Sequence, residues 1–273
     1  MKKDTYKKEM TIKNSQQKNG ALNNRADVRK IQSWLTLFSI QNPHVASATA
    51  IDGDFGKATE KAVKNFQESI NVPTDGIITQ KLFSILCSDM KYAFEKPLRS
   101  NNLRDLVLES AENHVKSHPL ELVIKGESNS GPWVRSYMDG HQGSEWFWCM
   151  GFVQTIIDQA CSKQGKSLTK LMPWTYSCDT AGTTGLEKGL LSRYTQIRKN
   201  PNIMKPGDVF LIQKSKYDWF HTGIITHIDN DIIETIEGNT NREGSHNGIA
   251  VMKRTRNYRK SKIDVFSINP IVN

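Results

Sequence analysis

The spacing of apolar residues changes along this chain, from a helical period in the first part to short β-branched runs in the last third. Up to about residue 160, apolar residues recur three or four positions apart in several segments. After residue 206 come five short runs, at 209–212, 222–227, 232–236, 248–252 and 265–268. Helices followed by strands favour an α+β fold with an antiparallel sheet over a parallel α/β fold.

The chain begins with a basic segment that has no apolar run. Six of the first 18 residues are lysines. We therefore expect residues 1–23 to form a disordered tail and not a secretory signal peptide. Nowhere does the chain approach the roughly 18 to 20 apolar residues of a membrane-spanning helix, so we expect no stable membrane insertion.

The net charge of the chain is +9, and a second basic cluster lies near the C-terminus. Its members are Lys253, Arg254, Arg256, Arg259, Lys260 and Lys262. Neither basic cluster has the interleaved aromatic residues of a nucleic-acid motif. We expect no nucleic-acid partner, and the charge favours another polyanion such as the bacterial envelope.

Residues 24–95 have the pattern of three short helices. Val28, Ile31 and Leu35 mark the first, and a second begins near Thr59. A turn at Asp75-Gly76 leads to the third, and residues 96–102 then read as a linker. Three helices in about 70 residues can enclose a small core.

Three motifs in this segment resemble the three-helix peptidoglycan-binding domain found beside many cell-wall hydrolases. They are Val28-x-x-Ile31-Gln32-x-x-Leu35, Asp52-Gly53-x-Phe55-Gly56-x-x-Thr59 and Ala62-Val63-x-x-Phe66-Gln67. The resemblance implies that peptidoglycan is a partner. It implies wall binding through Asp52, Gly53, Phe55, Gly56 and Gln67. The connection over residues 36–50 is extended in this copy, which leaves the shape of the binding groove open.

The four cysteines, Cys87, Cys149, Cys161 and Cys178, are too few and too scattered for a disulfide framework. They also lack the paired spacing of a zinc site. The acidic segment Asp52-Gly53-Asp54 lacks the full ligand spacing of a calcium loop. We therefore expect no metal and no organic cofactor.

Cys149 differs from the other cysteines because it stands at the start of a predicted helix over residues 149–160. The positive end of a helix dipole and its unpaired N–H groups favour a thiolate. His221 opens a predicted strand, from which it can take the thiol proton. The next strand ends in Glu237-Gly238-Asn239, and either Glu237 or Asn239 can orient the imidazole.

Residues 103–273 resemble a CHAP-type amidase/peptidase domain, a papain-fold group that cleaves peptidoglycan. The matching positions are Glu127-x-Asn129-x-Gly131, Trp148-Cys149-x-x-Phe152-Val153, Pro206-Gly207-Asp208, His221-x-Gly223-Ile224 and Glu237-Gly238-Asn239. The resemblance implies an α+β domain with helices packed on an antiparallel sheet. It also implies Cys149 as nucleophile, His221 as base and Glu237 as its orienting partner, with Asn239 as a further polar member.

Aromatic residues around these positions are candidates for contacting substrate. Trp148 precedes the cysteine, while Trp219 and Phe220 precede the histidine. Asn129, like Glu127, either shapes the cleft or caps a turn. His227 and His246 are further polar candidates, although neither fits the base position as well as His221 does. Residues 166–200 are rich in loops, and their sequence does not indicate which substrate they would select.

These patterns lead to the expectation of a cysteine-dependent peptidoglycan hydrolase, either an N-acetylmuramoyl-L-alanine amidase or an endopeptidase. Two alternatives stay open: a catalytically inactive wall-binding protein, and a papain-like hydrolase of another amide. We expect a monomer made in the cytoplasm that acts on the wall. Without a signal peptide, it would reach the wall through phage lysis, in a holin-dependent manner, or through a specialised secretion machine.

Overall fold

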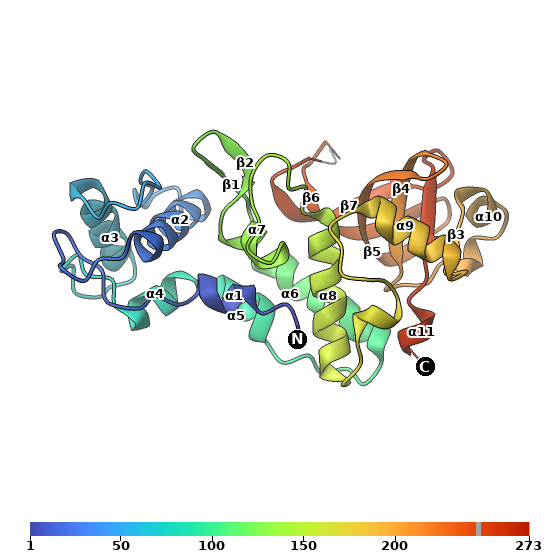
Figure 1. Cartoon of the computed structure of the whole chain (residues 1–273), viewed down its shortest axis with the longest axis horizontal. Helices are drawn as coiled ribbons and strands as arrows, with labels where there is room; N and C mark the ends of the chain where they lie inside the picture. The colour runs from blue at the N-terminus through green and yellow to red at the C-terminus, as the bar shows by residue number, and fades with distance from the viewer. Residues whose placement is uncertain (244–246, 273) are drawn as a thin grey trace.

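The computed structural model describes residues 1–243 and 247–272 and has an α+β fold, as the change of hydrophobic period predicts. Helices occupy the first half of the chain, and a six-stranded antiparallel sheet with flanking helices forms the second. Figure 1 shows an elongated molecule with a small helical module at one end and the sheet at the other.

The small module is built from α2 (Arg25–Gln41), α3 (Lys57–Ser69) and α4 (Gln80–Leu86). Asn24 caps α2, since its side chain accepts hydrogen bonds from the N–H groups of Ala26 and Asp27. The apolar residues expected at helical spacing are buried between the helices, with Ile31, Leu35 and Phe66 at 0% exposure. The three predicted helices are therefore present.

Residues 1–23 are packed against the rest of the protein, so the expectation of a disordered tail is wrong. They contain α1 (Thr5–Glu9), whose Tyr6 is buried and stacks on Phe94 with ring centroids 4.3 Å apart. Lys3 is also buried and forms a 2.9 Å ion pair with Asp139. Apolar and aromatic contacts thus offset the cost of ordering a segment whose composition resembles that of a disordered one.

A further helix, α5 (Ser88–Glu95), follows α4 and contacts the second part of the chain, after the linker. Gln159 donates hydrogen bonds to its Ala93 and Phe94 carbonyls at 3.1 and 3.2 Å. Its Phe94 contacts His114 in α6 (Leu103–Lys116) edge-on, with centroids 4.8 Å apart. In Figure 1, α5 lies beside α1 between the small module and the sheet domain. The predicted boundary at residue 95 therefore comes after a helix that belongs, by its contacts, to the second part.

The second part continues with a hairpin and two helices before the sheet. The hairpin consists of β1 (Leu122–Ile124) and β2 (Glu127–Ser130). It leads into α7 (Pro132–Tyr137) and the central helix α8 (Cys149–Lys163). The segment expected to be rich in loops, residues 166–200, and the residues just after it contain several short elements. These are η1 (Leu168–Lys170), α9 (Cys178–Glu187), β3 (Leu191–Ser192), α10 (Tyr194–Lys199) and η2 (Pro201–Ile203).

The main sheet has the strand order β3-β8-β4-β5-β6-β7, and its recorded pairings are antiparallel. Its longer strands are β4 (Val209–Ser215), β5 (Asp218–Asp229), β6 (Ile232–Thr240) and β7 (Ala250–Asn257), with β8 (Ile263–Phe266) shorter. The chain described ends in α11 (Asn269–Val272). Consecutive strands are neighbours from β4 to β7, which places the carboxyl end of β6 beside β5.

Helix α8 lies directly on this sheet, and a glycine sets the distance of approach. A Cβ atom on Gly238 of β6 would lie 2.7 Å from Cβ of Phe152 and 3.0 Å from the ring of Trp148. The missing side chain allows the first turns of α8 to press against β6. The start of α8 is thereby brought next to the strands that carry His221 and Glu237.

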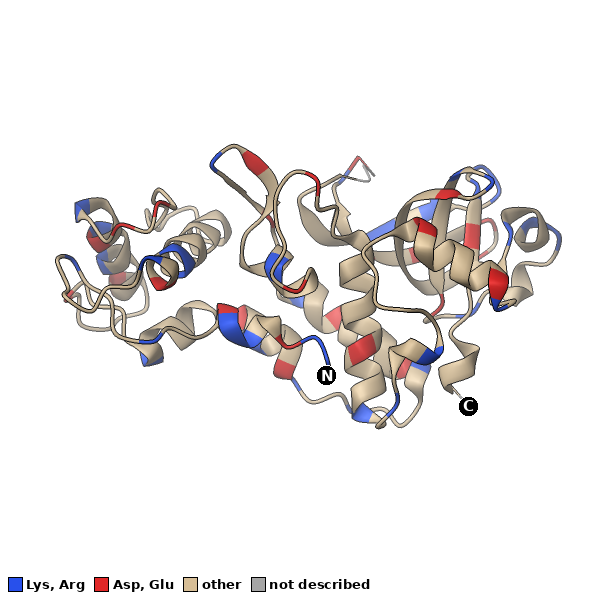
Figure 2. Cartoon of the chain, viewed as in Figure 1, with Lys and Arg blue, Asp and Glu red and all other residues tan. Residues whose placement is uncertain are grey.

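Basic and acidic residues alternate along the helices and strands of both parts of the chain, as Figure 2 shows. Several members of the C-terminal basic cluster form ion pairs, such as Lys253 with Glu112 and Arg259 with Asp231. Within the described ranges, the helices are all too short or too polar to cross a bilayer.

Candidate active site

Cys149 is the first residue of α8, and its thiol is in the environment expected of a nucleophile. Among the described residues, none provides a side-chain hydrogen bond that caps this helix end. The pKa of Cys149 is well below its ordinary value. A hydrogen bond from the Cys178 thiol, the interaction with His221 and the Met150 N–H all lower this pKa against the opposing effect of burial.

His221 lies in β5 with its side chain fully buried. It is the fourth residue of a strand that begins at Asp218, inside the sheet between β4 and β6. The expectation that His221 opens a strand is therefore wrong. The strand begins earlier because Trp219 pairs with Gln213 of β4.

The two ring nitrogens of His221 face different partners. Nε2 is 2.7 Å from Oε2 of Glu237. Nδ1 is buried without a fully formed hydrogen bond to any group in the described part of the chain. Burial alone would lower the pKa of His221, but the interactions with Cys149 and Glu237 outweigh it and raise this pKa to about 9. The arrangement favours a thiolate and imidazolium pair.

Glu237 is held by a set of donors that the sequence does not suggest. Arg256 of β7 donates from Nε and Nη2 to its two oxygens, and Thr235 donates to Oε1 at 2.6 Å. Burial would raise the pKa of Glu237, yet the hydrogen bonds from Arg256 and His221 lower it to about 2. Glu237 is thus an anion in the fully buried site, and a two-pronged guanidinium contact fixes its orientation.

The sequence does not mark Arg256 as a residue of this site, because Arg256 belongs to a run of basic residues near the C-terminus. The contact between Arg256 and Glu237 can be predicted only from the register in which β6 pairs with β7. Glu237 pairs with Met252 in the β6–β7 ladder, and Arg256 lies further along the same strand. A sequence without known pairing does not reveal that contact.

Asn239 and Asn129 form a second buried pair beside this site. Nδ2 of Asn239 donates to Oδ1 of Asn129 at 2.9 Å, and Asn129 donates to the carbonyl of Ser144 at 3.1 Å. Both residues have a positive φ, +55° and +48°, in the left-handed region that asparagine tolerates better than most residues. The hydrogen bond between the two asparagines connects β6 to the β1–β2 hairpin. Of the two candidates for the partner of His221, Glu237 and Asn239, Glu237 forms the hydrogen bond.

Of the predicted substrate contacts, both tryptophans are core residues, which corrects that part of the expectation. Trp148 is fully buried, stacks on Tyr137 and donates to Glu121 at 2.9 Å. Trp219 is buried and donates to Asp264 at 2.8 Å. Large aromatic rings with a satisfied N–H are stable in a core, and sequence does not separate that role from ligand contact.

Two exposed phenylalanines lie close to Cys149 and His221 in the chain. Phe220, directly before His221, is 38% exposed, so its ring is accessible to a substrate, as a substrate-contacting residue requires. Phe147, which the sequence analysis did not select, is 45% exposed and lies two residues before Cys149. Of the other candidate histidines, His227 is exposed, and His246 lies outside the described residues.

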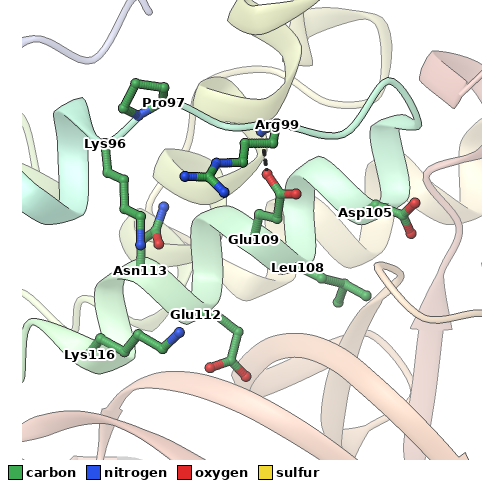
Figure 3. Close-up of a pocket in the computed structure, with 9 residues that line it drawn as sticks. All are labelled: Lys96, Pro97, Arg99, Asp105, Leu108, Glu109, Glu112, Asn113 and Lys116. Atoms are coloured by element: carbon green, nitrogen blue, oxygen red, sulfur yellow. Dashed lines mark hydrogen bonds between the residues drawn. The ribbon is translucent and has the colours of Figure 1, made fainter.

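A surface cavity of about 480 Å³ lies along α6, away from the residues above (Figure 3). Glu109 points to the linker there, and its carboxylate accepts the N–H of Arg99 at 2.7 Å and that of Ser100 at 3.2 Å. Cys149, His221 and Glu237 do not line this cavity. Its contacts hold the linker in place.

In the small module, the predicted wall-binding residues mostly have structural roles. Gln32 bonds Asp52 and accepts the N–H of Gly53 at 2.8 Å. Gln67 repeats the arrangement with Asp75 and Gly76. Each buried glutamine therefore closes one Asp-Gly turn, where the glycine has a positive φ.

Of the remaining wall-binding candidates, Phe55 is a core residue at 3% exposure, and Gly56 is the N-cap residue of α3. Gln67 also lines a cavity of about 220 Å³ in this module. That cavity includes Pro73, Leu82 and the half-exposed Ile85. It is a concave surface with both apolar and polar groups.

Part of the chain matches the model of a known family. Residues 24–86 match a family described as "Putative peptidoglycan binding domain". The matched segment runs from the cap of α2 to the end of α4 and stops before α5. Searches of curated proteins and of solved structures return no match. The N-terminal module is therefore similar to peptidoglycan-binding domains, which suggests a cell-wall-related protein.

Proposed function

We propose that this protein hydrolyses an amide bond of peptidoglycan, with Cys149 as nucleophile and His221 as general acid and base. The observation that carries the proposal is the buried chain Cys149, His221 and Glu237, in which a thiol at a helix start meets an imidazole bonded to a carboxylate. Nucleophile, base and orienting group are the three roles of a cysteine hydrolase.

In the first half of the reaction, the Cys149 thiolate attacks the carbonyl carbon of the amide. The oxygen becomes an anion, and the free N–H groups at the start of α8 are suited to stabilise it. The imidazolium of His221 then gives its proton to the departing amine nitrogen as the C–N bond breaks. The product is a thioester on Cys149.

In the second half, His221 takes a proton from water, and the resulting hydroxide attacks the thioester. The C–S bond breaks, the carboxylate is released and the Cys149 thiolate is restored. Glu237 keeps Nε2 of the ring protonated and stabilises the imidazolium charge. Arg256 acts through Glu237 as a positioning residue, because its contacts fix the carboxylate and not the substrate.

The N-terminal module supports peptidoglycan as the substrate. A wall-binding module on the same chain raises the local concentration of the catalytic site at the wall. We assign the contact with the wall to the cavity around Ile85, which Gln67 also lines. The other predicted residues do not line it: Asp52 and Gly53 form a turn, Phe55 is in the core and Gly56 caps α3. We further propose that the protein acts on the wall as a phage lysis enzyme or a secreted effector.

The experiment is digestion of purified peptidoglycan followed by mass spectrometry of the soluble products. Release of the stem peptide from muramic acid identifies an amidase, whereas a new amine within the peptides identifies an endopeptidase. Both are amide cleavages that one thiolate mechanism serves. An absence of soluble products from the native protein would overturn the proposal and favour a wall-binding protein without catalysis. Equal cleavage of unrelated soluble amides would instead favour a general papain-like hydrolase.

A further inference from the structure

Cys178 is a second thiol in contact with the proposed nucleophile, and the reaction above does not use it. It is the first residue of α9, as Cys149 is of α8. The two sulfur atoms are 3.9 Å apart, and both residues are buried, at 7% and 2% exposure. All four cysteines are free thiols, and these two face each other across the starts of two helices.

The position of Cys178 is fixed by several contacts of α9. Ser177 caps the helix by accepting the N–H of Thr180 at 3.2 Å. Asp179 accepts the backbone N–H of Trp219 in β5 at 2.6 Å. A Cβ on Gly182 would lie 2.5–2.7 Å from the Trp219 ring, so the helix packs closely on that ring. These anchors hold the Cys178 thiol against Cys149.

The two thiols differ in their chemistry. The hydrogen bond between them lowers the pKa of Cys149 and raises that of Cys178 well above its ordinary value. Cys149 is therefore the thiolate and Cys178 the protonated donor. Thiolates react with peroxides, and a neighbouring thiol then determines whether a disulfide or an irreversible oxide follows.

We propose that Cys149 and Cys178 form a reversible disulfide when the protein meets hydrogen peroxide, and that this bond switches off the amide-cleaving site. The formation of the bond stands on the thiol geometry alone, while the loss of activity rests on the proposed function. The site is a modification site in which Cys149 is the attacking thiol and Cys178 the resolving one.

The chemistry proceeds in two steps. The Cys149 thiolate attacks one oxygen of hydrogen peroxide, so that an S–O bond forms, the O–O bond breaks and hydroxide leaves. Cys149 is oxidised by two electrons to a sulfenic acid, and the peroxide is reduced. The Cys178 sulfur then attacks the Cys149 sulfur. The S–S bond forms, the S–O bond breaks, and the departing hydroxide takes the Cys178 proton to leave as water.

The closing movement is small. A disulfide has an S–S length of about 2.05 Å, so the sulfurs must approach by about 2 Å from their 3.9 Å separation. Each cysteine is at the first position of its helix, where a change of side-chain rotamer does not break the i to i−4 hydrogen bonds of the helix interior. A dithiol such as dithiothreitol would reverse the reaction by reducing the bond to two thiols.

The other two cysteines provide internal controls. Burial raises the pKa of Cys87 to about 12 and that of Cys161 to about 11. The Cys87 thiol donates to the carbonyl of Phe83 at 3.0 Å. Neither environment favours a thiolate, so both should stay reduced while Cys149 reacts.

The test treats the whole protein with hydrogen peroxide, blocks the remaining thiols with iodoacetamide and maps peptides by mass spectrometry without reduction. We expect one linkage, Cys149 to Cys178, with a mass loss of two hydrogens. Wall cleavage should fall in proportion to this linkage and return to its untreated rate after dithiothreitol. Cys161→Ser should behave as the native protein does.

Cys178→Ser keeps a hydrogen-bond donor but cannot form the bond. Each variant is compared with its own untreated rate. In Cys178→Ser, Cys149 should proceed to the sulfinic acid, and dithiothreitol should not restore activity. Recovery of this variant to the native extent would overturn the proposal. So would a native protein whose oxidised Cys149 leaves Cys178 as a free thiol.

The peptide map keeps the two proposals apart. If Cys178→Ser does not fold, the map of the native protein decides whether the linkage forms. A protein that forms the linkage but never cleaves peptidoglycan would overturn the regulatory half together with the proposed function. A protein that cleaves peptidoglycan but forms no linkage would overturn only the redox proposal.

Discussion

Glu237 reaches His221 across Gly223, the residue two positions after the histidine on the same strand. A Cβ atom on Gly223 would lie 2.8 Å from Cγ of Glu237 and 2.8 Å from the Ile236 carbonyl oxygen. Residues two apart in a strand share a face, so any side chain at this position would occupy the path of the carboxylate. The glycine of the His221-x-Gly223 motif is therefore a requirement of the 2.7 Å contact between Nε2 and Oε2.

Gly223→Ala should lower both stability and activity. The methyl group forces the Glu237 side chain or the β6 backbone to move, and overpacking of this kind costs about 1–3 kcal/mol. Because the displaced carboxylate no longer holds His221, wall cleavage should fall more steeply than the folded fraction. Chemical denaturation and the cleavage rate under folding conditions measure the two effects. An alanine variant with unchanged activity would show that the contact is dispensable.

The cleavage rate should fall as the pH rises through about 9. His221 has a pKa of about 9 in the folded protein against an ordinary value of 6.5, and its protonated form donates to the departing amine. The same shift contributes stability that is fully present below pH 6.5 and is lost as the pH rises through about 9. Initial rates across this range give the alkaline limb.

Glu237→Gln should move that limb toward neutral pH, because the amide no longer stabilises the imidazolium. The rate at the optimum should fall by up to about 10⁴-fold, as when the orienting residue of a triad is replaced. Arg256→Gln should shift the limb in the same direction by a smaller amount, since it loosens Glu237 without removing its charge. A limb that stays in place in both variants would contradict the assigned roles.

Ile85→Asp should weaken attachment to the wall without changing the chemistry. Ile85 is 44% exposed and lines the cavity of the N-terminal module. Loss of its apolar contact should reduce binding to purified walls about tenfold, equivalent to about 1.4 kcal/mol. Ile40→Asp is the matched control, because Ile40 is 50% exposed on α2 and does not line that cavity. An equal loss of wall binding in both variants would show that the cavity is not the wall-binding surface.

Tyr6→Ala should destabilise the fold by about 3 kcal/mol, in the range for removal of a buried aromatic ring. The ring is 5% exposed and stacks on Phe94. Leu22→Ala, at a residue 69% exposed in the same N-terminal segment, should change the free energy of unfolding by less than about 0.5 kcal/mol. Denaturant titration measures both free energies of unfolding. If residues 1–23 were disordered, neither substitution would change the free energy of unfolding.

Local patterns predicted the elements that need only local information. The periods of the apolar residues gave the helices of the small module and most of the sheet strands. The start of α8 at Cys149 and the order of Cys149, His221 and Glu237 also followed from short motifs. These features depend on neighbours in sequence.

The features that the sequence did not predict, or predicted wrongly, depend on contacts between residues far apart in the chain. The role of Arg256 depends on the pairing of β6 with β7, which places it beside Glu237. The role of Cys178 depends on the packing of α9 against Trp219, which places its thiol beside Cys149. Residues 1–23 look disordered by composition, yet Tyr6 and Lys3 find partners in α5 and after α7. Burial of Trp148 and Trp219 follows from packing in three dimensions, which composition does not encode.

We propose above that the thiol of Cys149 cleaves a peptidoglycan amide. The most direct measurement is the rate of amine release from purified peptidoglycan by the native protein, Cys149→Ala and Cys161→Ala. Both cysteines are buried in α8, but only the pKa of Cys149 is lowered by an interaction with His221. We expect no release above background from Cys149→Ala and a rate close to native from folded Cys161→Ala. Amine release by Cys149→Ala at the native rate would show that Cys149 is not the nucleophile.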